Sequence, residues 1–207
     1  AARVREATSA IGVNLIWVEA GSVTVAGVRT GNAGAQNLVE EDLAAIRELC
    51  PLVTRLSPQV DTSVQVARGN MNWRTTVRGV TPEYLAIRNW QVVQGVAFTD
   101  QDVTTMANVC VLGKTVMENL FLPEEDPIGQ TIRVKDLPCK VIGMLPAKGG
   151  TVTGGDNDDT FLMPYTTVQK RIKGQTWLDD ILCSAVSDTV IDEAETQISQ
   201  ILRARHR

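Results

Sequence analysis

The chain has 207 residues, 43% of them hydrophobic and 4% aromatic, which is enough for one large core or two small ones built mainly from Val, Ile, Leu and Ala. Its net charge is −4 and it has no long cluster of lysine and arginine, so nucleic acid is not an expected partner. The longest apolar runs have four or five residues, far fewer than the roughly 20 that a membrane-spanning helix needs.

The N-terminal part of the chain predicts a helix, a strand, a loop and a second helix. Residues 1–12 are typical of the last turns of a helix that ends at Gly12, and "NLIWVEAG" follows as a strand. Residues 21–36 are rich in Gly, Ala, Ser and Thr and indicate a loop. The second helix is expected to begin at Asn37, whose side chain can cap it together with Glu40 three residues later.

The middle of the chain predicts mainly short strands. Three segments between residues 53 and 80 alternate with period two, which is typical of half-exposed antiparallel sheet. Thr81 begins one short helix, and Thr99 with Asp102 begins another. Four further strands are expected at 108–112, 130–135, 139–145 and 160–164.

The C-terminal part predicts a short helix that ends at Gly174, then the strand "DDILCSAVS", then a helix from about residue 189 to the end. The last helix carries acidic residues in its first turn and Arg203 and Arg205 in its last, which suits the helix dipole. The whole pattern is that of an α+β fold with many short strands and few long helices.

The stretch "NVCVLGKTVMENLF" contains Gly113, Lys114 and Thr115 between an extended run and a helix-like run. A phosphate-binding loop of the form G-x-x-x-x-G-K-[ST] requires a further glycine at position 108, where the chain has Asn108. The side chains between Asn108 and Gly113 favour extended, buried backbone. The sequence therefore predicts a strand that turns at Gly113 into a short helix, and no nucleotide site.

No set of residues predicts catalysis, a metal site or a bound cofactor. The chain has a single histidine, His206, near an end that is expected to be frayed, so it is a poor partner for a serine or cysteine nucleophile. Glu124, Glu125 and Asp126 lie between two prolines and indicate a solvated turn. Asp156, Asp158 and Asp159 carry oxygens that suit calcium, but the spacing and the closing glutamate of an EF-hand are missing.

Motifs along almost the whole chain resemble one known family. The most specific is "VRGVTPEYLAIRNWQVVQGVAFTDQD" at residues 77–102. The others, in order, are "SAIGVNLIWVEAG", "VEEDLAAI", "VCVLGKTVMENLF", "PIGQTIRV", "CKVIGML" and "MPYTTVQKRI". In this order and spacing the chain resembles the periplasmic core domain of MacB-like ABC transporter permeases.

The resemblance implies two lobes: a porter-like βαβ lobe from both chain ends (13–88 plus 176–207) and a small α/β lobe inserted at 89–175. Residues 1–12 would then be the end of a stalk helix. The resemblance further implies an extracytoplasmic domain on the periplasmic face of the inner membrane, within a membrane-embedded parent protein. In such proteins ATP is hydrolysed in a separate cytoplasmic domain, so the fragment itself would not be an enzyme.

The partners implied by the resemblance are a second permease copy, a periplasmic adaptor and an outer-membrane channel, and the isolated domain is expected to be a monomer. A Gly-rich, acidic segment within 146–159 is the candidate contact for a partner. Its candidate residues are Lys148, Gly149, Gly150, Thr151, Asp156, Asp158 and Asp159. The alternatives are a lipoprotein-release or peptide-sensing permease domain, or a stand-alone binding module.

The four cysteines fit either buried thiols or two disulfides. Cys50 and Cys183 lie on apolar stripes that are typical of a core. Cys110 and Cys139 lie in strands expected in the same lobe, and a periplasmic location permits a bridge between them if those strands are neighbours.

Overall fold

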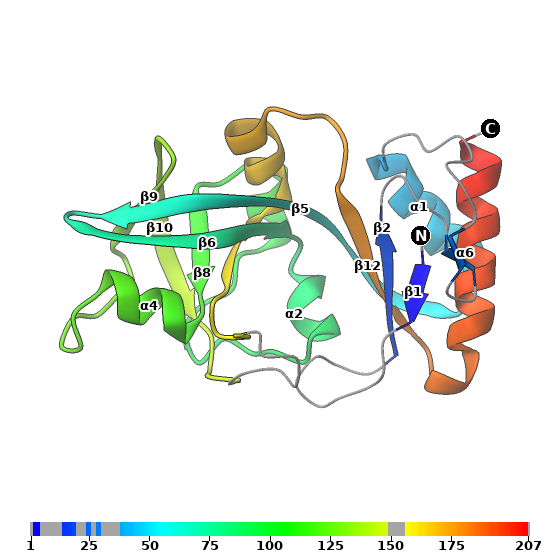
Figure 1. Ribbon diagram of the computed structural model, residues 1–207, viewed down its shortest axis with the longest axis horizontal. Coiled ribbons are helices and arrows are strands. Elements are labelled where there is room, and N and C mark those ends of the chain that lie inside the picture. The colour runs from blue at the N-terminus through cyan, green and yellow to red at the C-terminus, as the bar shows by residue number, and fades with distance from the viewer. Residues whose placement is uncertain are drawn as a thin grey trace. The chain divides into compact units, whose positions relative to one another are not determined.

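The computed structural model has a mixed α/β, sheet-dominated fold (Figure 1). The structure describes residues 2–4, 14–19, 24–25, 28–29, 38–148 and 156–206. Among these residues no helix combines the length and the hydrophobicity that a membrane crossing needs.

The chain divides into two compact units. Unit 1 contains residues 1–59, 83–89 and 176–207, and unit 2 contains residues 60–82 and 90–175. The chain therefore passes from one unit to the other at 59/60, 82/83, 89/90 and 175/176. This division differs from the predicted one, which kept residues 60–82 together with the two chain ends.

Unit 1 has a four-stranded antiparallel sheet with the strand order β1-β2-β12-β5. Its strands are β1 (Ala2–Val4), β2 (Leu15–Glu19), β12 (Asp180–Ala185) and the first part of β5 (Val53–Arg68). The C-terminal strand β12 lies between β2 and β5, so the sheet joins both ends of the chain. Strand β1 shows that the helix predicted for residues 1–12 is wrong at residues 2–4, and residues 5–13 lie outside the described residues.

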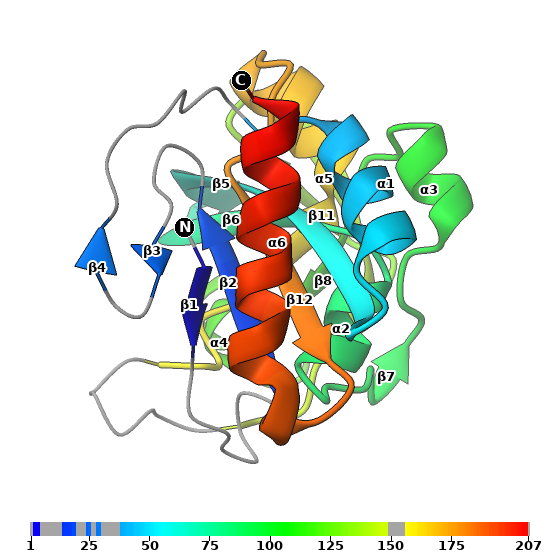
Figure 2. The same cartoon turned by 90° about the vertical axis from the view of Figure 1, so that its right-hand side faces the viewer.

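The helices of unit 1 are α1 (Glu40–Leu49), α2 (Glu83–Ile87) and α6 (Ile191–Arg205), with a short 3-10 turn, η2 (Asp188–Val190), before α6. In Figure 2, α1 and α6 lie side by side in front of the sheet. A short hairpin, β3 (Thr24–Val25) and β4 (Val28–Arg29), completes the unit.

Helix α6 is held on the sheet by an apolar face with helical spacing, formed by Ile191, Ala194, Ile198 and Leu202, all of them buried. Helix α1 begins at Glu40 with Val39 as its N-cap, later in the chain than predicted, and the predicted cap Asn37 lies outside the described residues.

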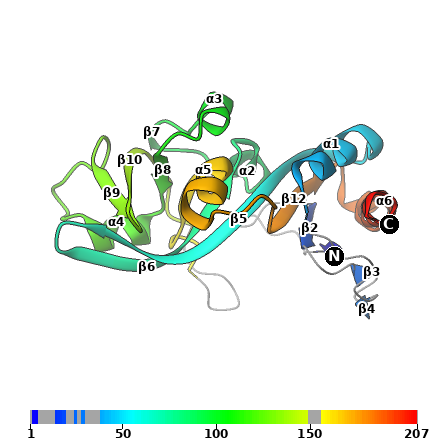
Figure 3. The ribbon, with the colours of Figure 1, turned by 90° about the horizontal axis from the view of Figure 1, so that it is seen from above.

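Unit 2 is built around strands that pair in a closed ring, in the order β5-β6-β11-β8-β10-β9 and back to β5. Its strands beyond β5 are β6 (Met71–Val80), β8 (Val109–Leu112), β9 (Thr131–Val134), β10 (Leu137–Met144) and β11 (Phe161–Pro164). The two-residue strand β7 (Gln94–Gly95) is added at β10. Figure 3 shows the long β5–β6 hairpin with β9 and β10 behind it.

The ring closes around a core of alternating apolar side chains, as in a small barrel. Val66, Val77, Ile132, Val141 and Phe161 are each fully buried. The helices of unit 2 are α3 (Asp100–Thr104), α4 (Lys114–Leu120) and α5 (Tyr165–Thr167), which continues as the π-helix η1 (Val168–Lys173).

Several local predictions are confirmed in unit 2. Thr99 caps α3 and pairs reciprocally with Asp102, with the Asp102 amide donating to Thr99 Oγ1 at 3.2 Å. Gly174 ends η1 in the left-handed conformation, at φ 67°.

Candidate functional site

The turn at Gly113 is a packing contact and does not have the geometry of a phosphate cradle. The Gly113 amide donates to the carbonyl oxygen of Thr160 at 2.8 Å, and the Thr115 amide donates to that of Asp158 at 3.1 Å. A Cβ on Gly113 would lie 2.3 Å from the Asp158 carbonyl oxygen, which explains why glycine is needed. These two amides are therefore committed to the neighbouring segment and cannot face a phosphate.

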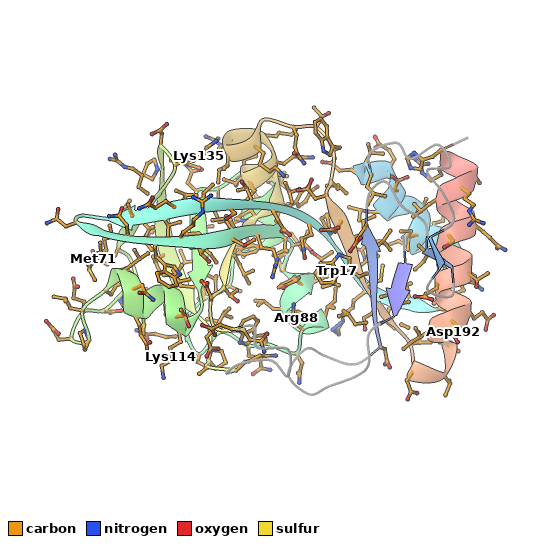
Figure 4. All side chains as sticks on the ribbon, viewed as in Figure 1. Trp17, Met71, Arg88, Lys114, Lys135 and Asp192 are labelled. Carbon is orange, nitrogen blue, oxygen red and sulfur yellow. The ribbon has the colours of Figure 1, made fainter. Side chains whose placement is uncertain are left out.

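Lys114, the next residue, gives a second argument against a phosphate site. Lys114 lies at the start of α4 with its side chain 53% exposed, directed outward (Figure 4), and pairs with Glu118 on the same helix at 3.9 Å. Such an (i, i+4) pair is an ordinary feature of a solvent-facing helix. The predicted strand, turn and helix are confirmed.

The three aspartates of the predicted partner segment are used to fix its second half. Asp156 accepts from Thr115 Oγ1 at 2.6 Å and from the Asp158 amide at 2.8 Å. Asp158 in turn accepts from the Lys148 amide at 2.6 Å, which ties the start of the segment to its end. Gly149, Gly150 and Thr151 lie outside the described residues.

Asp159 faces a different neighbour. Its Oδ1 accepts from Trp73 Nε1 at 3.0 Å and from Thr75 Oγ1 at 2.7 Å, both on β6. The carboxylates of Asp156, Asp158 and Asp159 thus have separate partners. Within the described part of the chain, no group of three His, Cys, Asp or Glu residues is placed to hold a metal ion.

The four cysteines are buried free thiols. Burial raises the pKa of Cys139 and of Cys183 to about 12, and it raises the pKa of Cys110 well above its ordinary value. Cys110 and Cys139 do lie on neighbouring strands, β8 and β10, but the structure has no bond between them, so the predicted bridge is wrong here. Buried thiols of such high pKa are unreactive.

A buried ionic cluster in unit 1 was not predicted. Asp42 is fully buried near the start of α1, and its carboxylate accepts from the Val39 amide at 2.9 Å. Arg205 Nε lies 2.7 Å from Asp42 Oδ1, and His206 Nε2 lies 3.0 Å from both carboxylate oxygens. The end of α6 is therefore bound to the start of α1, whereas the sequence suggested a frayed end at His206.

A signal for this cluster is present in the sequence. Asp42 lies one helical turn before Ile46 and two turns before Cys50, on the apolar face of α1. A carboxylate on that face must be buried, and a buried charge needs a counter-ion. Only the structure shows that the counter-ions come from α6, about 160 residues away.

A second ion pair binds α1 to the rest of unit 1. Arg47 donates from its two terminal guanidinium nitrogens, Nη1 and Nη2, to the two carboxylate oxygens of Glu83 on α2, at 3.2 and 3.1 Å. Glu83 also accepts from the Leu56 amide on β5 at 3.0 Å.

In unit 2, the turn at 124–126 is solvated as predicted at Glu124 and Asp126, which are exposed, while Glu125 is half-buried. Arg68 forms a two-pronged ion pair with Glu125, donates to the Leu120 carbonyl oxygen at 3.3 Å and stacks 4.4 Å from the centre of the Phe121 ring. The hydrogen bond from Arg68 lowers the pKa of Glu125, and the Leu122 amide adds to this. The pair fixes the segment after α4 to the end of β5.

The arrangement in both units is that of a fold whose polar side chains bind segments of the chain to one another. Two solved structures have the same fold. The periplasmic region of MacB from Actinobacillus actinomycetemcomitans superposes with a TM-score of 0.75 at 23% identity, covering 95% of this chain and 86% of that one. The extracellular domain of the noncanonic ABC-type transporter YknZ from Gram-positive bacteria gives 0.73 at 18% identity, covering 92% and 94%.

The fold is thus that of the extracytoplasmic domains of ABC transporters. The family model of the MacB-like periplasmic core domain matches residues 3–201, and the chain belongs to this family. Among curated relatives, macrolide export ATP-binding/permease protein MacB of Azoarcus sp. is 38% identical over 205 residues, and that of Rhodospirillum rubrum is 35% identical over 196. These alignments cover 99% and 95% of this chain, and the chain spans 30% of the length of each relative.

Proposed function

We propose that this domain is the mechanical, extracytoplasmic part of an efflux transporter of the MacB type. In this proposal the parent permease is embedded in the inner membrane and works with a second copy, a periplasmic adaptor and an outer-membrane channel. ATP is hydrolysed in another domain, and the motion reaches this domain through its membrane anchors. The domain itself performs no chemistry and needs no cofactor.

The observation that carries the proposal is the family match over residues 3–201, together with the relatives named for macrolide export. The contacts of the described residues agree with a mechanical role, because ion pairs between distant residues hold segments of the chain together. We assign the porter-like lobe to unit 1, which contains both chain ends, and the inserted lobe to unit 2.

We assign partner contact to the segment that begins at Lys148 and ends at Asp159. Its last residues are fixed to the body of unit 2, because Asp156 accepts from Thr115 and Asp159 accepts from Trp73. The Lys148 amide donates to Asp158, so the start of the segment is tied to its end. Binding residues of proteins are often found in loops that a rigid scaffold positions, which supports this assignment.

The export role is tested with the full-length parent transporter in a strain that lacks it. Macrolide resistance should return with the complete transporter and fail to return when the ATPase is inactivated or residues 1–207 are replaced by an unrelated domain. Full resistance from a transporter without this domain would overturn the proposal.

The contact segment is tested by replacing residues 149–155 with a Gly-Ser linker of the same length, which leaves the anchoring aspartates in place. Adaptor pull-down should then be lost while the fold is kept, as judged by an unchanged melting temperature. The matched control replaces the exposed pair Glu40 and Glu41 with alanine and should retain the adaptor. Unchanged adaptor binding by the linker variant would reject the assignment. Light scattering on the 207-residue chain should give a monomer.

A further inference from the structure

Helix α1 is attached to α6 at two points. At its start, Asp42 binds Arg205 and His206. At its end, Cys50 Sγ donates a weak hydrogen bond to Gln197 Oε1 at 3.3 Å. The two helices therefore run antiparallel, and they lie side by side in Figure 2.

The two attachment points are separated by the same distance along each helix. Asp42 and Cys50 are eight residues apart on α1, and Gln197 and Arg205 are eight residues apart on α6. At a rise of 1.5 Å per residue, both intervals are about 12 Å long. A helix fixed at one point can swivel about it, whereas fixation at two points of equal spacing makes the pair move together.

The attachment at Asp42 is the stronger of the two. Its carboxylate is fully buried, and the side chains that bind it are Arg205 and His206. Moving the end of α6 away from α1 would leave a buried charge without a counter-ion, which is far less favourable than losing an exposed ion pair. The same carboxylate caps α1 through the Val39 amide, so a displacement of α6 acts directly on the start of α1.

Helix α1 is in turn attached to the parts of unit 1 that lead out of it. Arg47 binds Glu83 at the start of α2, and Glu83 binds the Leu56 amide. Helix α2 lies between the chain crossings at 82/83 and 89/90, and Leu56 lies three residues before Gln59, the last residue ahead of the crossing at 59/60. The Arg47–Glu83 ion pair thus connects α1 to segments that lie next to three of the four crossings, those at 59/60, 82/83 and 89/90.

We propose that α1 is a relay helix: it transmits displacements of α6 through the Arg47–Glu83 pair to the segments that lead into unit 2. Asp42 and Arg47 are its positioning residues. The proposal rests on the proposed function for its source of motion, because in that function α6 is the element nearest the C-terminal membrane anchor. The network itself exists in the 207-residue chain and is tested there.

The test is amide hydrogen exchange, followed residue by residue by NMR, on the 207-residue chain. The reporter is the Leu56 amide, whose recorded partner is the Glu83 carboxylate, together with the amides of Arg88 and Asn89 at the end of α2. Asp42→Ala should speed exchange at these amides by about tenfold, the effect of losing about 1.4 kcal/mol of local stability. Glu41→Ala, which removes the exposed neighbouring carboxylate, should leave them unchanged.

Two further variants keep the result decisive. Arg205→Ala removes a side chain that is 35% exposed, so it is expected to fold even if Asp42→Ala does not, and it should speed exchange at Leu56 in the same direction. Arg47→Ala should speed exchange at Leu56 while leaving the last turn of α6 protected. If Asp42→Ala or Arg205→Ala speeds exchange only in α1 and α6, the relay role is wrong.

The two proposals fail separately. In the full-length transporter, Asp42→Ala is expected to lower export while ATP hydrolysis continues. If Asp42→Ala has no effect on exchange, the relay role of α1 is refuted, and normal export by the transporter would still support the efflux role. An exchange effect in a parent protein that exports nothing removes the efflux role and leaves the network of unit 1 as described.

Discussion

Glu195 on α6 should make the stability of the domain fall as the pH rises. The residue is 8% exposed, and its Oε1 is buried without a hydrogen-bond partner. Burial, and to a smaller extent the charge of Asp192 three residues earlier on the helix (labelled in Figure 4), raise the pKa of Glu195 from 4.5 to about 7. Substitution by glutamine removes the ionisable group and keeps the shape.

The sign follows from proton binding. The folded domain keeps the proton on Glu195 up to about pH 7, whereas the unfolded chain releases it near pH 4.5. Between these values the folded state binds more protons, so this contribution to stability is complete below pH 4.5 and is lost as the pH rises through 7. A difference of this size corresponds to about 3 kcal/mol at pH 8.5.

The assay is urea unfolding of wild type and Glu195→Gln at pH 5 and pH 8.5, followed by tryptophan fluorescence. The variant should match wild type within about 1 kcal/mol at pH 5 and exceed it by about 3 kcal/mol at pH 8.5. Glu193→Gln, an exposed change of the same charge on the same helix, should follow wild type at both values. Parallel pH profiles for wild type and Glu195→Gln would show that the carboxyl group is ionised in the folded domain and would refute the reasoning.

Three further variants test the packing described above. Gly113→Ala places a methyl group 2.3 Å from the Asp158 carbonyl oxygen and should lower the free energy of unfolding by more than about 1 kcal/mol, measured in urea. Phe161→Ala leaves a cavity in the core of unit 2 and should cost about 3–5 kcal/mol by the same measurement. Arg68→Ala should return the lowered pKa of Glu125 towards its ordinary value, seen by NMR titration. Wild type, unlike Arg68→Ala, should then lose an increment of stability as the pH falls through that lowered pKa.

Each of these has an outcome that contradicts it. A fully stable Gly113→Ala domain would mean that the turn has space for a side chain. A small effect of Phe161→Ala would mean that the ring of strands is not closely packed. An unchanged Glu125 titration in Arg68→Ala would mean that the ion pair is not formed in solution.

Much of the local structure could be predicted because its signals are local. The capping residues Thr99 and Asp102 and the helix-ending Gly174 act on their own neighbours, and each was placed correctly. Period-two alternation identified the residues of β5 and β6 as extended, although it gave three segments where the structure has two strands. Burial of Cys50 and Cys183 followed from the apolar stripes on which they lie.

What could not be predicted depends on pairing between distant residues. Nothing within the sequence near Asp42 indicates that its partners are Arg205 and His206, and nothing near Arg68 indicates Glu125. The closure of the strands of unit 2 into a ring depends likewise on the contact of β9 with β5. The helix expected at residues 1–12 is absent at residues 2–4 because those residues pair with β2, which outweighs a weak helical preference.

The position of β12 in the middle of the first sheet has a consequence for synthesis. A chain that emerges N-terminus first holds β2 and β5 early, but the strand that must lie between them arrives only at residues 180–185. Unit 2 has all its strands by residue 164. We therefore expect unit 2 to reach its native state first. The edges of β2 and β5 remain unpaired, and can pair wrongly, until the last forty or so residues have left the translocation channel.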